Sequence, residues 1–444
     1  MEGRRSVGQY SLFGTLLNSA HKKLNGTSTQ PQQENRLFLN TNIPTSFFIC
    51  GLQGSGKSHT LSCLLENYLI PSNLLGVLRS PLSALVLHYD PFSTKQAFRP
   101  CEAVFLAGID PTFPTEPSIR SVTVLVSPSN YHNMCIAYGQ IPHVAVRALR
   151  LRPRDLTCGS MQALMSIDQS HAVPLYMSQV VRILRTMSAE SAVFDYRDFK
   201  RRLHGQGFKG PQKEMLEQRL SLLESFLNLD HEELQEPLLE DAPGALTIVD
   251  LSCPFVNQDM ACLLFNICVE LYLSSPKATG KVIAVDEAHK YMADTPGARV
   301  LTQQLLAIIR LQRHCNTRVV VATQEPTISP LLIGLTSVKI IHHFSSVDWY
   351  QALNKHLPQR NEGDPGSDHA ETHKRTHFDQ IAQLERGEAV VFDPSAILGG
   401  INIDFSTVPT YTGASIYDKC FVAKIRKRVT LDGGRSIVCV GEDG

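Results

Sequence analysis

A glycine-rich stretch followed by lysine and serine carries the strongest chemical signal in the sequence. Residues 51–58 read Gly-Leu-Gln-Gly-Ser-Gly-Lys-Ser and follow an apolar run, 47–50, that is typical of a buried strand. The backbone N–H groups of such a loop, together with the positive end of a helix that begins at Lys57, converge on one point where phosphate can bind. The pattern therefore predicts a phosphate-binding loop of the kind that holds a nucleoside triphosphate.

The residues of this loop have separate expected roles, and the expected cofactors are ATP and Mg²⁺. Lys57 is expected to reach the β and γ phosphates, and the Ser58 hydroxyl to ligate the magnesium ion. Glycines permit the close approach that a Cβ would block. The alternative is an accidental glycine turn, which the strand before the loop and the helix after it disfavour. The predicted nucleotide-binding residues are Gly51, Gly54, Ser55, Gly56, Lys57, Ser58 and His59.

Two adjacent carboxylates at the end of a second apolar run form the next motif. The run 281–285 is followed by Asp286 and Glu287. Asp286 is predicted to hold the magnesium shell, and Glu287 to polarise the attacking water. The alternative is a pair of solvated surface acids. Gln324 follows a further predicted strand, 318–323, and is expected to sense the γ-phosphate or orient the water, unless it only caps the strand end.

Composition limits the classes of protein that can carry these motifs. Lys plus Arg equals Asp plus Glu at 42 each, so the sequence lacks the net positive charge that is typical of a strong nucleic-acid binder. The 11 cysteines form no C-x-x-C pair, which suits a reducing compartment and argues against a structural zinc site. No apolar run of about 18 residues is present. We therefore expect a soluble intracellular protein, cytoplasmic or nuclear, with no membrane association.

The spacing of apolar runs predicts the fold. Runs at 84–90, 121–126 and 246–250 are separated by helix-length segments, which indicates an α/β fold with a mostly parallel sheet. Between them the strand signal fades and helical periodicity takes over. We expect a RecA-like P-loop NTPase core with a helical insertion, divided as follows: a mobile tail over 1–40, the core over 41–127 and 244–430, the insertion over 128–243, and a C-terminal tail over 431–444.

Two further groups of residues have open interpretations. The insertion carries the basic clusters Arg147/Arg150/Arg152/Arg154 and Lys200/Arg201/Arg202, which either contact phosphates or solvate helix faces. His369, His373 and His377 are spaced by four residues and would share one face of a helix, as a metal site requires. The loop-like residues before them favour a solvated linker.

The motifs together resemble those of the HerA/FtsK-type ATPases, which are motor proteins that move double-stranded DNA. The resemblance covers about residues 36–430 and rests on 51–58, Asp90-Pro91, 249–252, 285–289, 384–391, 424–428, and Arg313 placed 11 residues before Gln324. It implies a homo-oligomer, a hexameric ring, in which Arg313 acts as a finger in the neighbouring subunit's ATP site and Gln324 is the sensor. The HerA branch has a small N-terminal β-barrel, and we expect this chain to lack it.

The string Asp286-Glu287-Ala288-His289 also matches a DEAH-box RNA helicase, but the chain lacks the other motifs of that class and a second RecA-like half. Two hypotheses remain for the function. The first is an oligomeric motor ATPase, a DNA translocase or helicase-like protein. The second is a nucleotide-dependent switch or scaffold that does not move along a polymer.

Overall fold

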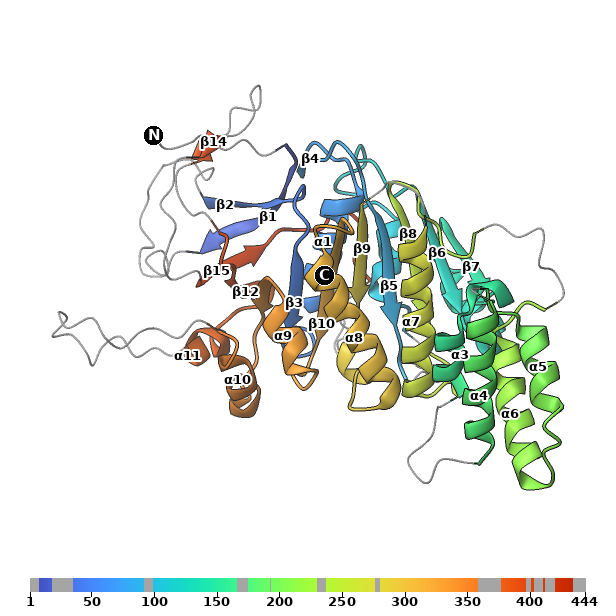
Figure 1. The fold of residues 1–444 in the computed structure, drawn as a ribbon. Helices are drawn as coiled ribbons and strands as arrows, with labels where there is room; N and C mark the ends of the chain where they lie inside the picture. The colour runs from blue at the N-terminus through green and yellow to red at the C-terminus, as the bar shows by residue number, and fades with distance from the viewer. Residues whose placement is uncertain are drawn as a thin grey trace, which may run out of the picture.

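One mixed sheet forms the centre of the described structure, and helices cover both of its faces (Figure 1). In the part of the chain that the structure describes, this sheet has 13 strands. The computed structural model describes residues 8–17, 35–91, 99–165, 175–191, 193–229, 237–275, 280–357, 377–396, 401–402, 410–411 and 420–433.

The parallel part of the sheet contains the strands that the apolar runs predict. Its strands lie in the order β11, β3, β10, β9, β5, β8, β6, β7. Their bounds are Val338–Ile341, Ser46–Cys50, Thr317–Thr323, Lys281–Val285, Ser83–His88, Ala245–Asp250, Ser121–Val126 and Val144–Ala148 in that order. β10 pairs with β3 on one side and with β9 on the other. The strand before the glycine loop and the strand before the two acids are therefore separated by one additional strand.

An antiparallel part extends the sheet beyond β11. β12 (Glu388–Phe392), β15 (Cys420–Ile425), β1 (Tyr10–Leu17) and β2 (Arg36–Asn40) follow in that order, and β4 (Gly76–Val77) pairs with β1. A separate pair consists of β13 (Ile401–Asn402) and β14 (Thr410–Tyr411).

The structure differs from the mobile tail that we expected over residues 1–40. β1 pairs with β15 from the other end of the chain, with Gly14 opposite Ile425. The Arg426 side chain fixes this contact, because it donates to the Leu12 carbonyl at 2.8 Å and to the Glu66 carboxylate at 2.6 Å. Residues 1–7 and 18–34 lie outside the described residues. Of the C-terminal tail expected over 431–444, only 431–433 are described.

Each face of the sheet has its own apolar core. In β3, Phe47 and Ile49 point to one face, and Phe48 and Cys50 to the other. The first face is covered by α1 (Lys57–Leu69), α2 (Tyr131–Tyr138) and the short 3-10 helix η3 (Glu102–Ala107). The second is covered by α7 (Gln258–Ser274), α8 (Pro296–Leu311), α9 (Pro330–Leu335), α10 (Val347–Asn354) and α11 (His377–Ala382). Burial on both faces explains the near-continuous apolar character of the parallel strands.

The expected helical insertion is present but narrower than 128–243. α3 (Cys158–Met165), α4 (Leu175–Glu190), α5 (Tyr196–His204) and α6 (Pro211–Ser225) lie together beside α7 (Figure 1). β7 and α2 lie within the range that we assigned to the insertion, yet β7 pairs with β6 as part of the sheet. Its sequence, Val-Ala-Val-Arg-Ala, is too short and too mixed to stand out as a strand.

The expected fold class is confirmed. The chain has an α/β core with a mostly parallel sheet, a glycine-rich loop between β3 and α1, and a helical insertion. In the described residues, no helix combines the length and the apolar character that a membrane span requires.

Candidate active site

The glycine loop connects β3 to α1, as the sequence predicts. Gly54 and Gly56 have positive φ angles of 77° and 115°, a region of backbone conformation that favours glycine. At Gly51 a Cβ would lie 2.6 Å from the Cβ of His342. The loop therefore requires glycine at these positions, for its turn and for its close packing against β11.

Lys57 and Ser55 both donate hydrogen bonds to one backbone carbonyl within the loop. The Lys57 ammonium donates to the Leu52 carbonyl at 2.9 Å, and the Ser55 hydroxyl donates to the same oxygen at 2.7 Å. Lys57 is 5% exposed, and burial lowers its pKa, while the charges of Glu287 and Asp286 oppose that shift. A lysine held in this position presents its charge at the mouth of the loop, where phosphate oxygens would replace the carbonyl as its acceptor.

His342 supports the loop from behind and was not predicted from the sequence. It follows β11, is fully buried, and its Nδ1 lies 2.9 Å from the Glu388 carbonyl oxygen, to which it donates. Its Nε2 then accepts from the Thr60 hydroxyl of α1 at 2.9 Å. Burial lowers the pKa of His342 to about 4. This neutral imidazole links α1 to β12 next to the glycine loop.

The depressed pKa of His342 predicts a loss of stability in acid. An unfolded chain takes up the proton near pH 6.5, whereas the folded chain resists it until about pH 4, so stability is lost as the pH falls through this window. For this one group we expect the free energy of unfolding to fall by about 2 kcal/mol between pH 7 and pH 5. Chemical denaturation at both pH values measures it. His342→Gln keeps a donor and an acceptor but does not titrate. Its free energy of unfolding should therefore fall by about 2 kcal/mol less than that of the wild type over the same pH range. Equal decreases in the two proteins would contradict the lowered pKa of His342.

Glu287, Gln324 and His289 meet at the carboxyl end of the sheet. Gln324 follows β10, and its amide donates to the Glu287 carboxylate at 3.1 Å. The His289 Nε2 lies 3.5 Å from the same carboxylate, and the Gln324 backbone N–H donates to His289 Nδ1 at 3.3 Å. Burial and the neighbouring Asp286 raise the pKa of Glu287. Glu287 also has a left-handed backbone, with φ 52°. Such a conformation in a non-glycine residue stores strain and is characteristic of functional sites.

Strand register brings these groups beside the glycine loop. Cys50 pairs with Thr323 and Val321 pairs with Val285, so the residues that follow β3, β10 and β9 emerge at one edge of the sheet. The Cys50 thiol also donates to the Gln324 carbonyl at 3.3 Å. The carboxyl ends of neighbouring parallel strands are the usual location of a ligand site in an α/β fold.

The oxygen donors expected for Mg²⁺ lie at the same edge. Ser58 is in the first turn of α1 and is partly exposed, and Asp286 follows β9 and is 4% exposed. A hydroxyl and a carboxylate are the ligand types that Mg²⁺ prefers, with water and phosphate oxygens completing its shell. The donor set therefore fits the ion.

His59 is positioned differently from the other loop residues. Its Nε2 lies 2.8 Å from the Arg426 carbonyl oxygen, and its Nδ1 lies 4.0 Å from Asp432. Its side chain is directed toward the C-terminal segment, so a contribution of His59 to nucleotide binding would come through its backbone N–H.

Arg313 lies far from the other predicted residues. It is exposed in the turn between α8 and β10, whereas Gln324 follows the opposite end of β10. A strand of this length separates the two by about 20 Å, so Arg313 does not join the site of its own chain. Within the described part of the chain, Arg313 has no ion-pair or hydrogen-bond partner.

Two other groups of side chains lie near the acids. Lys290 forms an ion pair with Asp90 at 3.0 Å, which connects the residues after β9 to those after β5. His88 and Cys101 lie against Asp286, with His88 Nδ1 at 3.5 Å from its carboxylate. Burial raises the pKa of the Cys101 thiol to about 11. Lys290, His88 and Cys101 were not predicted as site residues, because the segments that they contact lie far away in the chain.

At least four of the seven residues in the two basic clusters have acidic partners. Arg152 pairs with Asp155, Lys200 with Glu224, Arg201 with Asp198, and Arg202 with Glu190 and Asp198. This favours the interpretation that they stabilise helix surfaces. His369 and His373 lie outside the described residues, and His377 begins α11. The described cysteines are all free thiols.

Comparisons with known proteins give distant structural likenesses. A scan against protein-family models and a search of the curated proteins find no match. Among solved structures, VirB4 of Thermoanaerobacter pseudethanolicus is 13% identical, with coverage of 86% of this chain and 89% of that chain and a TM-score of 0.46. The bacterial conjugative coupling protein TrwB, in a trigonal form with sulphate, is 11% identical over 98% of each chain with a TM-score of 0.46.

A third similar structure is the genome packaging NTPase B204 from Sulfolobus turreted icosahedral virus 2 in complex with AMPPCP. It is 8% identical, with coverage of 79% of this chain and 92% of that chain and a TM-score of 0.29. At these identities and TM-scores the likenesses assign neither a family nor an activity, so the functional conclusion depends on the site itself.

Proposed function

We propose that this chain binds Mg·ATP in the loop between β3 and α1 and hydrolyses it. The observation that carries the proposal is the convergence of three parts at one sheet edge: the loop with Lys57, the acid pair after β9, and Gln324 in contact with Glu287. A loop that binds phosphate without hydrolysing it has no need of a half-buried carboxylate oriented by an amide.

The roles of the residues follow from their positions. Lys57 and the backbone N–H groups of 54–58 bind the phosphates. Ser58 and Asp286 would hold Mg²⁺, which supplies charge neutralisation between the β and γ phosphates. Glu287 takes a proton from the attacking water, and Gln324 holds the Glu287 carboxylate in place and senses the γ-phosphate. Burial raises the pKa of Glu287, which makes this carboxylate a stronger base.

We further propose that the ATPase is an oligomeric motor of the HerA/FtsK type that acts on double-stranded DNA. Arg313 supports this, because it is exposed and without an ion-pair partner in the described structure, at the opposite edge of the sheet from its own loop. In a ring, such an arginine reaches the ATP site of the neighbouring subunit. The alternative is a nucleotide-dependent switch without translocation, and stimulation of hydrolysis by double-stranded DNA would distinguish the two.

Lys57→Ala should abolish tight ATP binding and leave the fold intact. The lysine supplies the positive charge at the mouth of the loop, and among the described residues its hydrogen bond is to the Leu52 carbonyl within that loop. Equilibrium titration with a fluorescent ATP analogue measures the affinity, and circular dichroism checks the fold. Lys213→Ala, which removes an exposed lysine from α6, is the matched control and should bind as the wild type does. Unchanged affinity in Lys57→Ala would refute the assignment of the loop.

A further inference from the structure

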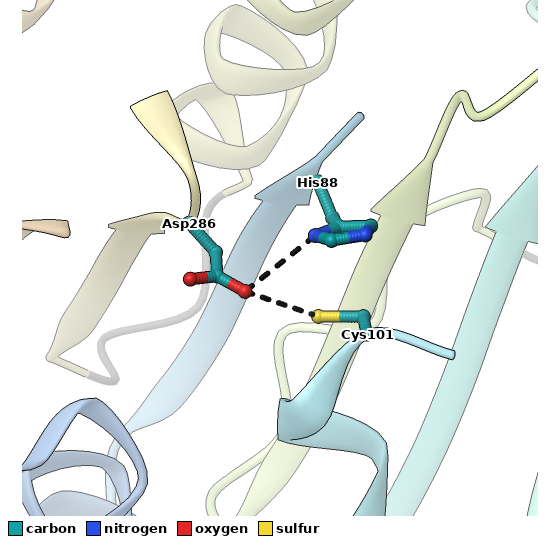
Figure 2. A group of neighbouring side chains, drawn as sticks. All are labelled: His88, Cys101 and Asp286. Carbon is teal, nitrogen blue, oxygen red and sulfur yellow. Dashed lines mark hydrogen bonds and ion pairs between the residues drawn. The ribbon is translucent and has the colours of Figure 1, made fainter. Parts of the chain in front are cut away.

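Three side chains with metal-binding donors meet next to Glu287, and one of them is Asp286 of the acid pair. His88 ends β5, Cys101 precedes the short helix η3, and Asp286 follows β9. β5 and β9 are parallel neighbours with Leu87 opposite Val285, so the next residue of each strand lies side by side. Figure 2 shows the His88 ring and the Cys101 sulfur directed toward the same carboxylate oxygen of Asp286.

The donor atoms are close together. The Asp286 Oδ2 lies 3.5 Å from His88 Nδ1 and 3.8 Å from Cys101 Sγ, and the three donor atoms lie within 4.8 Å of one another. A tetrahedral Zn²⁺ with nitrogen and oxygen ligands at about 2.0–2.2 Å and sulfur at about 2.3 Å separates its donors by roughly 3.3–3.6 Å. The two separations from the Asp286 oxygen, 3.5 Å to His88 and 3.8 Å to Cys101, match this geometry to within a few tenths of an ångström.

The cluster is enclosed, and one of its polar atoms has no hydrogen bond. His88 is 6% exposed, Cys101 0% and Asp286 4%. His88 Nδ1 is buried and lies 3.5 Å from the Asp286 carboxylate, but it makes no well-aligned hydrogen bond to that carboxylate or to another described residue. Buried nitrogen atoms in folded proteins almost always have such a partner, and leaving one without costs about 1–3 kcal/mol. A cation between the three donors would satisfy this nitrogen.

We propose that His88, Cys101 and Asp286 bind a divalent transition metal ion of the zinc class, at a site separate from the Mg²⁺ site of the nucleotide. The ligand types decide the class of metal. Thiolate and imidazole select Zn²⁺ and its chemical relatives, whereas Mg²⁺ prefers oxygen ligands alone. Three protein ligands leave one coordination position for water.

The site shares one ligand with the nucleotide site. Figure 2 shows that the second carboxylate oxygen of Asp286 points away from His88 and Cys101, so one oxygen serves the transition metal and the other stays available to the Mg²⁺ shell. Occupancy would therefore fix the orientation of Asp286. This coupling rests on the proposed function, but binding of the transition metal does not.

Binding is tested on the full chain without nucleotide, after removal of metals with a chelator. Titration with Co²⁺ should produce a thiolate-to-cobalt charge-transfer band that saturates at one equivalent, and Zn²⁺ should displace it. Cys101→Ser should lose the band and bind Zn²⁺ at least about tenfold more weakly in competition with a chromophoric chelator. Cys268→Ser removes another fully buried thiol, from α7, and should retain the band.

A measurement on the unaltered protein covers the case in which Cys101→Ser does not fold. X-ray absorption of the zinc-loaded wild type should show one sulfur at about 2.3 Å together with nitrogen and oxygen neighbours at about 2.0–2.2 Å. A zinc shell without sulfur, the absence of a cobalt band in the wild type, or an unchanged band in Cys101→Ser would overturn the proposal. The three side chains would then form only a buried hydrogen-bonded cluster. ATP binding through Lys57 would be unaffected by that result, so the two proposals fail independently.

Discussion

Glu287→Gln should bind ATP with near-normal affinity and hydrolyse it about 10² to 10⁴ times more slowly than the wild type. The amide oxygen can still accept the hydrogen bond from Gln324, so the substitution preserves the local contact at 3.1 Å. What it removes is the ability to take a proton from water. Because the phosphates bind to the loop and to Lys57, the loss should appear in the chemical step and not in affinity.

Single-turnover hydrolysis, with protein in excess over ATP, isolates this step from product release. Glu214→Gln is a matched control, because Glu214 is an exposed glutamate in α6, distant in the fold from the site. It should hydrolyse ATP as fast as the wild type. Near-normal turnover in Glu287→Gln would place the base at another residue.

Arg313→Ala should also be nearly inactive, although Arg313 lies about 20 Å from the predicted sensor of its own chain. A cation supplied by a neighbouring subunit stabilises charge on the transferred phosphoryl group and contributes about three to five orders of magnitude in related systems. Activity per subunit should rise with protein concentration as rings assemble. Arg310→Ala is the matched control, since Arg310 is exposed in the last turn of the same helix, α8.

Mixing the two inactive variants tests whether the site is shared between subunits. An interface between an Arg313→Ala subunit and a Glu287→Gln subunit can combine an intact Glu287 with an intact Arg313. The mixture should therefore hydrolyse ATP faster than either variant alone. A mixture that assembles but stays as inactive as its components would show that Arg313 does not complete a neighbouring site.

The parallel part of the fold could be predicted because its signals are local. Each of these strands is a short apolar run buried on both faces, and the bounds expected for 121–126 match β6. β1 and β2 could not be predicted, since β1 pairs with β15 from the other end of the chain and β2 pairs in turn with β1. β7 was hidden for a similar reason, because its partner β6 determines its conformation.

The residues of the candidate site also divide into those that local motifs predict and those that only the folded structure brings together. Gly51–Ser58 and Asp286-Glu287 are contiguous motifs, so their chemistry can be predicted from spacing alone. Gln324 could be placed at the end of its strand from the sequence, but its contact with Glu287 is seen only in the structure. His342, His88 and Cys101 carry no motif, because only the folded sheet brings them beneath the loop and the acids. A single sequence contains no signal for such tertiary neighbours.

Phosphate release from Mg·ATP by the unaltered chain tests the central claim most directly. It should be measured over a range of protein concentrations, with and without double-stranded DNA, beside Lys57→Ala. The account predicts continuous release by the wild type, a higher rate per subunit as the concentration rises, and no release by Lys57→Ala. The contradicting result is a wild type that binds ATP through Lys57 yet releases no phosphate under any of these conditions, as a nucleotide-dependent switch would.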